Sequence, residues 1–246
     1  MKRIALEETD STNNYLSAWC DTHQAEPFTT VTAEFQTAGK GQRGNSWESA
    51  AGANLLFSTV LFPRFLQARQ QFLLSQAVSL SIKEALDAYV PEVSIKWPND
   101  IYCGERKICG ILIENDLQGS CIGRCIVGVG LNVNQEAFHS DAPNPVSLRQ
   151  LTAVCHDRER LLEDILQRLE HYYHELEDDT TGCVAQMLAE RYAAALFRRS
   201  GFHRYADAQG TFLACVAGVG ADGRFLLQDN SGRLRSYLFK EVQYLL

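Results

Sequence analysis

The segment Lys96–Glu114 contains the residues of this chain most suited to chemistry. It reads K-W-P-N-D-I-Y-C-G-E-R-K-I-C-G-I-L-I-E, with a bend expected at Pro98-Asn99 and a basic pair, Arg106-Lys107, before an almost wholly apolar strand. A buried ammonium group without a partner is energetically costly. A lysine at the mouth of a buried strand therefore predicts a cation held against an anionic ligand.

A glycine-rich loop, Gly39-Lys40-Gly41-Gln42-Arg43-Gly44, matches G-x-G-x-x-G. A dinucleotide fingerprint would need a helix directly after the loop and an acidic residue ~20 positions later. Here the segment 45–52 is polar, a strand follows it, and position 64 is an arginine. A Walker A loop would need Lys-Ser or Lys-Thr where this chain has Asn45-Ser46, and the H-R-D and D-F-G motifs of kinases are absent from the sequence.

A ligand-binding role remains for this loop. We expect its glycines to take positive φ and to let the backbone approach a ligand closely. Lys40 and Arg43 carry charges that suit phosphate or carboxylate, and Trp47 could stack on a flat heterocycle. The alternative is a flexible surface turn beside a core tryptophan, and the loop by itself favours that alternative.

Length and composition limit the class of protein. The chain has 246 residues, 46% of them hydrophobic, and a formal net charge of −7. This predicts one domain of ~200 residues with a small second one, and it argues against a nucleic-acid partner. Acidic residues interrupt the start of the chain where a signal peptide would be apolar, and the longest apolar stretch, near Cys125–Val133, is about half a membrane span. We expect a cytoplasmic protein without a membrane partner.

The eight cysteines include no C-x-x-C pair, so we expect free thiols in a reducing compartment and assign no metal-ligand set. Apolar periodicity predicts helices over 11–23, 65–90, 158–178 and 183–198, and strands over 29–36, 54–62, 93–97, 107–114 and 121–131. The segment 135–147 is expected to be a loop. After Arg199-Ser200-Gly201 the pattern changes to short strands with glycine turns, which predicts a separate β-barrel. The predicted domains are therefore 1–198 and 199–246.

Five segments of the chain, in this order and spacing, resemble the biotin protein ligases, also called biotin–[acetyl-CoA-carboxylase] ligases. They are Asp10–Tyr15, Gln36–Trp47, Lys96–Ile101, Arg106–Leu112 and Gly128–Asn134. The resemblance covers roughly residues 4–246. It implies an α+β fold, in which a catalytic domain with a mixed β-sheet, of the biotin/lipoate ligase type, precedes a small SH3-like β-barrel.

The resemblance also implies a reaction with two steps. Biotin and ATP form biotinyl-5′-adenylate, and a lysine of the biotin carboxyl carrier protein or domain of a carboxylase then takes the biotin. ATP and biotin are substrates, and Mg²⁺ is expected on the pyrophosphate. A homodimer is a further arrangement that the resemblance allows.

The resemblance assigns site residues as well. Lys107 and Arg43 are the implied catalytic residues, with Lys107 bridging the biotin carboxylate and the α-phosphate. The implied biotin-binding residues are Ser11, Thr12, Asn13, Gln36, Gly39, Lys40, Gly41, Gln42, Lys107 and Gly110. The implied ATP- and adenylate-binding residues are Lys40, Arg43, Trp47, Asn99, Lys107 and Asn132, with Trp47 stacking on adenine and Asn132 recognising it through its amide.

Structural alternatives remain open for several of these residues. Ser11 could simply cap a helix, and Gln36 could point outward from its strand. Lys107 could be a solvated strand end, and Asn99-Asp100 could be a turn after Pro98.

Two features concern how this chain differs from relatives. The family's loop commonly reads G-R-G-R-x-G, whereas Lys40 and Gln42 stand at the two arginine positions here. Lysine lacks the bidentate fork and glutamine lacks the charge, so we expect weaker retention of the adenylate, partly compensated by Arg43 or Lys40.

Because the ligand segment begins at Ser11, we expect no helix-turn-helix domain and no DNA binding. In the C-terminal domain, Glu241 is the residue proposed to help orient ATP or the carrier.

Three other functions compete with biotin ligation. A lipoate–protein ligase would share the fold and the adenylation chemistry, but its arginine-and-glycine motif is missing. A non-catalytic biotin or adenylate sensor is expected to lose the basic residue at 107 or the glycine loop, and both are present. A nucleotide-binding structural module would leave Ser11–Asn13 and Gln36 without a role.

Overall fold

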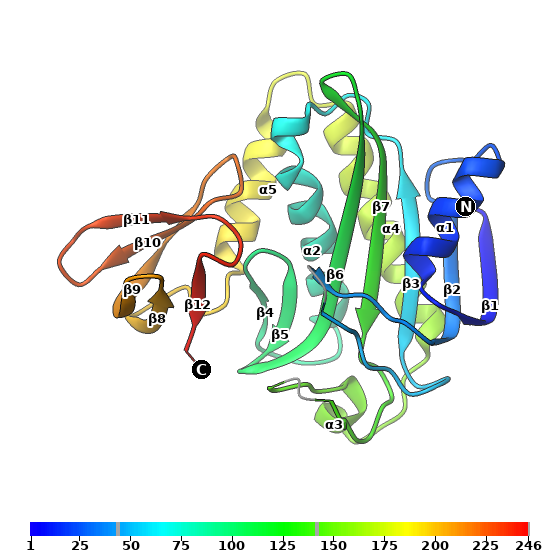
Figure 1. The fold of residues 1–246 in the computed structure, drawn as a ribbon, viewed down its shortest axis with the longest axis horizontal. Helices are drawn as coiled ribbons and strands as arrows, with labels where there is room; N and C mark the ends of the chain where they lie inside the picture. The colour runs from blue at the N-terminus through cyan, green and yellow to red at the C-terminus, as the bar shows by residue number, and fades with distance from the viewer. Residues whose placement is uncertain (43–44, 141–142, 246) are drawn as a thin grey trace.

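The first seven strands form one mixed sheet in a computed structural model that describes residues 1–42, 45–140 and 143–245. The strand order is β1-β2-β3-β7-β6-β5-β4 (Figure 1). Only β1 and β2 run parallel, and the other neighbours are antiparallel. The bounds are β1 Arg3–Thr9, β2 Thr30–Gln36, β3 Leu55–Leu61, β4 Val93–Lys96, β5 Asp100–Cys103, β6 Arg106–Gln118 and β7 Cys121–Leu131.

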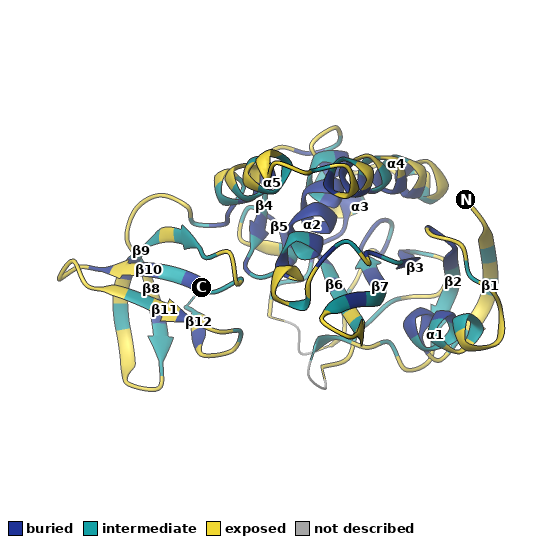
Figure 2. Cartoon of the chain, turned by 90° about the horizontal axis from the view of Figure 1, so that it is seen from above, coloured by how far each residue is buried: buried dark blue, intermediate teal, exposed yellow. Residues whose placement is uncertain are grey.

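Helices cover both faces of this sheet. On one face lie α2 (Phe72–Leu86), α4 (Arg158–Glu177) and α5 (Cys183–Ala194), whereas α1 (Thr12–Thr22) lies on the other (Figure 2). Successive strand residues point to opposite faces, and β3 follows this rule. Phe57 and Leu61 belong to the large core beneath α2 and α4, while Val60 packs with Leu16 of α1 in a separate cluster. The strand β3 is therefore buried on both sides.

The helix α4 illustrates how local sequence fixes an element. Asp157 caps it by accepting hydrogen bonds from the backbone N–H groups of Glu159 and Arg160 at 2.9 and 3.2 Å. A stripe of leucines and isoleucine then faces the core, and each such side chain contributes roughly 1.5–3 kcal/mol on full burial. The predicted helix over 158–178 is confirmed to within one residue.

The last five strands form a second, antiparallel sheet in the order β11-β10-β9-β8-β12. Their bounds are β8 His203–Asp207, β9 Gly210–Val219, β10 Phe225–Asp229, β11 Leu234–Tyr237 and β12 Val242–Tyr244. Gly223 and Gly232 adopt φ of 83° and 87° in two of the turns, where glycine was expected. The predicted fold class, a mixed sheet followed by a small β-structure, is confirmed.

The two sheets share one hydrophobic core. Tyr192 of α5 and Tyr205 of β8 are both fully buried in the same cluster, together with Phe225 of β10. The division into 1–198 and 199–246 stays a prediction, because packing is continuous across it.

Several boundaries differ from the sequence-based expectation. The strands β1 and β5 and the short helix α3 (Leu148–Thr152) were not predicted. Each is short or carries polar residues, and β5 is a strand only because β4 and β6 pair with it. The helix expected over 65–90 is a 3-10 turn, Ala68–Gln70, followed by α2. The strand expected over 107–114 extends to Gln118.

Two expectations about the whole chain can be compared with the structure. All eight cysteines are free thiols, as predicted. Within the ranges given above, no helix combines the length and apolar character needed to cross a membrane.

Candidate active site

A cleft of ≈ 1170 Å³ opens on the α1 side of the sheet. Its walls come from the start of α1, the described part of the glycine loop, the turn between β4 and β5, and the strands β6 and β7. Residues 138, 140, 143–145, 239, 240 and 242–244 complete them. Most of the predicted site residues line it: Ser11, Thr12, Asn13, Gln36, Lys40, Gly41, Gln42, Trp47, Asn99, Lys107, Gly110 and Asn132. Gly39 lies beside the cleft rather than in its wall, and Arg43 falls outside the described residues.

Lys107 presents its ammonium group to this cleft from the start of β6. Its backbone N–H donates to the Asn144 carbonyl at 2.8 Å, and its carbonyl accepts from Val146 N–H at 2.9 Å. Its Nζ lies 2.8 Å from Asp100 Oδ2, and the two side chains are 31% and 32% exposed. Such a partly exposed pair contributes about 1 kcal/mol or less, so an anionic ligand can compete with Asp100 for the ammonium group.

A second cation, Lys96, stands at the far end of the same wall. Its Nζ donates to the Tyr102 hydroxyl at 2.9 Å and lies 5.1 Å from the ring centroid of Tyr244 in β12. Burial lowers the pKa of this ammonium group, although the charge of Asp100 raises it in part. The second sheet thus contributes directly to the cation-bearing wall.

Trp97, between these two cations in sequence, borders the cleft and packs its ring on the second sheet. Its ring stacks on Phe225 at 5.1 Å between centroids, and its Nε1–H donates to the Gly223 carbonyl at 2.9 Å. This tryptophan therefore anchors the turn between β4 and β5 on the second sheet, consistent with a wall that aims Lys107.

A chain of buried hydrogen bonds forms the α1 end of the cleft. Gln36 Oε1 accepts from Thr12 N–H and Oγ1–H at 2.8 and 3.1 Å. The Ser58 hydroxyl lies 2.7 Å from Thr12 Oγ1 and 2.6 Å from Asn13 Oδ1. Asn13 Nδ2–H donates to Glu114 Oε2 at 2.6 Å. We call Thr12, Asn13, Gln36 and Ser58 the polar relay.

These contacts bear on two alternatives raised by the sequence: that Gln36 points outward and that Ser11 simply caps a helix. Gln36 points inward to Thr12 rather than outward. Ser11 is 3% exposed and occupies the N-cap of α1, yet its hydroxyl makes no capping hydrogen bond to the helix. Ser58 was missed by the sequence analysis, although a serine within L-L-F-S-T-V-L was a visible signal.

A pair of glycines makes the floor of the cleft. Gly110 of β6 and Gly130 of β7 lie opposite each other in the ladder, and the Trp47 ring lies against both. A Cβ at Gly110 would lie 2.8 Å from Trp47 Cζ3, and one at Gly130 would lie 2.5 Å from Trp47 Nε1. Any larger residue would therefore displace the indole, whose ring centroid lies 5.7 Å from Lys107 Nζ.

Two glycines of the loop, Gly39 and Gly41, belong to the described residues, and Gly44 lies outside them. Positive φ was expected, but neither Gly39 nor Gly41 has it. A Cβ at Gly39 would instead lie 2.7 Å from the Trp47 carbonyl oxygen, and Trp47 N–H donates to the Gly39 carbonyl at 2.9 Å. Gly39 is required for close approach of two backbone segments, which fixes the position of Trp47.

Asn132 offers an acceptor that the described part of the chain leaves unused. It is 2% exposed, and its Nδ2–H donates to the Val146 carbonyl at 3.1 Å. Its Oδ1 is buried and has no hydrogen-bond partner among the described residues. A buried polar atom without a partner costs about 1–3 kcal/mol, and a ligand N–H at this point would recover that energy.

The remaining predicted residues are tied to one another. Gln42 Nε2–H donates to Asn99 Oδ1, and Asn99 Nδ2–H donates to the Ile111 carbonyl, each at 3.2 Å. Asn99 thereby braces the glycine loop against β6. Lys40 is exposed and donates to Asn14 Oδ1 at 2.6 Å. Glu241 accepts from Leu238 N–H at 2.6 Å, so it closes a turn rather than facing the cleft.

A resident metal centre has little support within the residues that the structure covers. They contain no group of three or more His, Cys, Asp or Glu side chains placed to hold an ion. Among the described residues, Asp100 is the one that brings a carboxylate to the cation-bearing wall of the cleft. One carboxylate together with substrate phosphates is the arrangement in which Mg²⁺ is commonly held.

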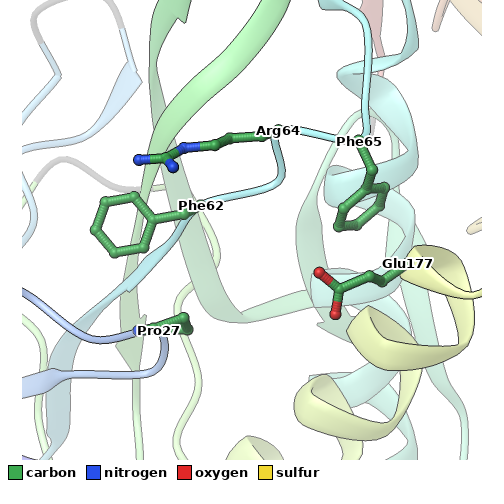
Figure 3. A pocket seen from close by; sticks show the side chains of 5 residues that line it. All are labelled: Pro27, Phe62, Arg64, Phe65 and Glu177. Atoms are coloured by element: carbon green, nitrogen blue, oxygen red, sulfur yellow. The ribbon is translucent and has the colours of Figure 1, made fainter.

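A second, smaller hollow of ≈ 390 Å³ provides a contrast (Figure 3). Its lining consists of Pro27, Phe62, Arg64, Phe65 and Glu177. None of the predicted site residues and no hydrogen-bond relay belongs to it. The larger cleft is therefore the candidate active site.

Comparisons with known proteins show the family of this chain. Residues 5–132 match the model of the biotin/lipoate A/B protein ligase family. The chain belongs to that family. It is 32% identical over 224 residues to the bifunctional ligase/repressor BirA of Bacillus subtilis, which covers 87% of this chain and 66% of BirA. It is 29% identical to the biotin–[acetyl-CoA-carboxylase] ligase of Paracoccus denitrificans, covering 93% of this chain and 95% of that protein.

A solved structure extends the family likeness to both sheets. The biotin protein ligase of Aquifex aeolicus, in complex with biotin and ATP, superposes with a TM-score of 0.81 at 26% identity, over 99% of each chain. The architecture of this family member, including the C-terminal sheet, is thus that of a biotin protein ligase.

Proposed function

We propose that the protein activates biotin with ATP to biotinyl-5′-adenylate and then transfers biotin to a specific lysine of the biotin carboxyl carrier protein of a carboxylase. The observation that carries this proposal is the order of groups along β7 and at the residue that follows it. Gly128 touches the polar relay, Gly130 supports Trp47, and Asn132 presents its free amide oxygen. Two-residue steps on a strand advance about 7 Å, so a ligand spanning them is about 13 Å long or more.

The first step joins two anions, and Lys107 addresses that problem. A biotin carboxylate oxygen attacks the α-phosphorus of ATP, and the bond from that phosphorus to the bridging oxygen breaks to release pyrophosphate. An ammonium group beside both reacting groups stabilises the charge that develops there, and binding both substrates in one cleft supplies the proximity term. Asp100 orients Lys107 until the substrates replace it.

The nucleotide half of the cleft suits adenine. The Trp47 indole offers a face for stacking, and Asn132 Oδ1 can accept a hydrogen bond from an exocyclic amino group. Mg²⁺ would be held by the phosphates together with Asp100, and when bound it would neutralise the leaving pyrophosphate. Arg43, on the glycine loop, is proposed to contribute a further charge to the phosphates.

The second step consumes the mixed anhydride. The neutral amine of a carrier lysine attacks the biotinyl carbonyl carbon, the bond to the phosphate oxygen breaks, and AMP leaves with the electron pair while the amine loses a proton. The glycine loop lies over the intermediate and limits its hydrolysis by water.

The polar relay favours biotin over lipoate. Biotin's ureido ring has N–H donors and a carbonyl acceptor, whereas the dithiolane ring of lipoate has neither. The relay groups can exchange their present partners for the N–H and carbonyl groups of a ureido ring, whereas a dithiolane ring offers no such replacement. Lipoate–protein ligation is the competing function, and it predicts no such preference.

The decisive experiment incubates the protein with ATP, Mg²⁺, a carrier domain and either biotin or lipoate. We expect pyrophosphate release and a carrier mass increase with biotin, and at most a trace of either with lipoate. A carrier whose target lysine is replaced by arginine separates the two steps, because adenylate should form without transfer. Absence of adenylate with biotin would overturn the proposal, and nucleotide or biotin binding without adenylate would identify a sensor.

A further inference from the structure

Glu48, the residue directly after Trp47, binds the backbone of the segment 138–140, which borders the same cleft. Its Oε1 accepts from His139 N–H at 2.8 Å, and its Oε2 accepts from Ser140 N–H at 2.7 Å. In the described part of the chain, the hydrogen bonds recorded for 138–140 all end on this carboxylate. Two consecutive backbone N–H groups are therefore held by one side chain that lies 91 residues away in sequence.

The base of the same segment has its own attachment. Gln135 is 3% exposed, and its Oε1 accepts from Ala50 N–H at 2.9 Å and from Asn54 Nδ2–H at 2.6 Å. Its own carbonyl accepts from the Ser147 hydroxyl at 2.6 Å. The root of the segment is thus fixed by a buried amide, whose Nε2–H also donates to Glu48 Oε1 at 3.5 Å, and the tip is fixed by Glu48.

Both attachments frame the nucleotide half of the cleft. Phe138 and Ser140 line the cleft together with Trp47 and Glu48. Asn132 lies three residues before Gln135, and its Oδ1 has no hydrogen-bond donor among the described residues. The position of Phe138 relative to Trp47 therefore depends on the Glu48 contacts.

A carboxylate in a cleft for ATP needs a physical reason, since it repels phosphate. Burial raises the pKa of Glu48, but the hydrogen bonds from Ser140 and His139 together lower it by more, so the group is charged at neutral pH. With both oxygens bound to backbone N–H groups, the negative charge is neutralised locally by the 138–140 segment. This favours a role in holding that segment rather than in binding substrate.

We propose that Glu48 is a positioning residue that clamps the segment 138–140 beside Trp47 and so completes the nucleotide half of the cleft. The inference rests on the proposed use of ATP. It predicts that loss of the clamp weakens nucleotide binding while biotin binding, at the polar relay, is unaffected.

The test compares Glu48→Ala, Glu48→Gln and a control, Asp179→Ala. Asp179 also accepts several backbone N–H bonds, from Thr181 to Ala185, but it caps α5 and does not line the cleft. We expect Glu48→Ala to raise the KM for ATP about tenfold, as the loss of hydrogen bonds to a charged group would. The KM for biotin should change less than about twofold. Glu48→Gln keeps one acceptor oxygen and should fall between Ala and wild type, whereas Asp179→Ala should leave both KM values unchanged.

A second measurement does not depend on catalysis. Hydrogen exchange at the amides of His139 and Ser140, in protein without substrates, should accelerate in Glu48→Ala and not in Asp179→Ala. Faster exchange with an unchanged KM for ATP would overturn the proposal, and so would unchanged exchange. If wild type makes no adenylate, the proposed function fails by itself, and affinities for a non-hydrolysable ATP analogue then decide on Glu48 by the same tenfold criterion.

Discussion

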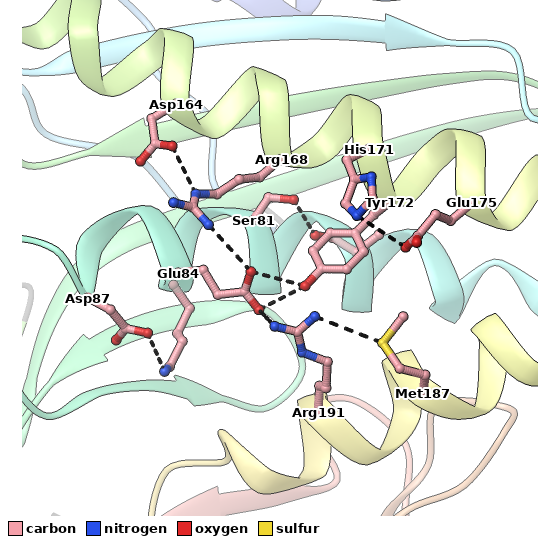
Figure 4. Close-up of polar contacts among 12 residues, drawn as sticks. Ser81, Glu84, Asp87, Asp164, Arg168, His171, Tyr172, Glu175, Met187 and Arg191 are labelled. Atoms are coloured by element: carbon pink, nitrogen blue, oxygen red, sulfur yellow. Dashed lines mark hydrogen bonds and ion pairs between the residues drawn. The ribbon is translucent and has the colours of Figure 1, made fainter.

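The cleft and the helix layer on the opposite face use similar polar residues in opposite ways. In the helix layer, Glu84 of α2 accepts from the Tyr172 hydroxyl at 2.8 and 3.0 Å and pairs with Arg191 at 2.9 Å and Arg168 at 3.8 Å (Figure 4). In the cleft, Asn132 Oδ1 and Trp47 Nε1 are buried without a described partner, and Lys107 forms a partly exposed ion pair with Asp100 that a ligand can replace.

The two regions differ in whether their polar groups already have hydrogen-bond or ion-pair partners within the protein. The Glu84 cluster joins three helices, and its carboxylate already has several partners, so it has little capacity left for a ligand. The cleft retains unpaired groups whose cost is recovered on binding. Charge and burial alone would not separate these regions, since both combine charged groups with partial burial.

The largest effect expected from this comparison is on Lys107→Ala. Loss of a charge that acts on the reacting groups should lower the rate of adenylate formation by about 100-fold or more, while the thermal unfolding temperature stays nearly constant. Lys83→Ala is the matched control, because Lys83 pairs with Asp87 on the surface of α2 and should retain full activity. Pyrophosphate release measures both, and normal release from Lys107→Ala would remove the distinction between the regions.

The next effect concerns the glycine floor. Gly130→Ala places a Cβ 2.5 Å from the Trp47 indole, so the ring must move. A forced shift of this kind costs about 1–3 kcal/mol, which corresponds to a loss of about 5- to 150-fold in kcat/KM for ATP. Introducing the same change into Trp47→Ala protein should cost much less, and additive losses in this double-mutant cycle would show that the contact is not the cause.

The helix layer should respond in the opposite manner. Glu84→Gln removes the counter-charge of Arg191, whereas Arg168 keeps its ion pair with Asp164 at 3.0 Å; the side chains of Arg168 and Arg191 are 37% and 49% exposed. Because solvent screens these groups, we expect a modest loss of about 1–2 kcal/mol in the free energy of unfolding, measured by urea titration. Adenylate formation at 25 °C should be unaffected. A catalytic defect in a variant that is still folded would contradict the assignment of this cluster to stability.

The smallest effect is expected from Gln42→Arg. An arginine adds a charge near the phosphates but gives up the hydrogen bond from Gln42 to Asn99. We expect the biotinyl-adenylate to dissociate a few-fold more slowly, with little change in its rate of formation. Rapid dilution of the preformed complex measures this off-rate, and an unchanged value would show that position 42 does not retain the intermediate.

Prediction from sequence succeeded for features with local signals. The amphipathic period of α4 and the apolar run of β7 are visible without tertiary information, and both elements lie where expected. The failures share a cause. The strand β5 forms because its neighbours in the sheet pair with it. Gly39 has no positive φ, and glycine is needed there because the Trp47 carbonyl leaves no room for a Cβ.

The sequence by itself determined the types of residue at the site. A lysine before an apolar strand, a tryptophan after a glycine loop and an asparagine at the end of β7 could be read directly, because each departs from its local pattern. Only the tertiary structure decided their partners: Asp100 for Lys107, Ser58 for Asn13 and Glu48 for the segment 138–140. These contacts depend on strand order and on packing between residues far apart in the chain, which local periodicity does not encode.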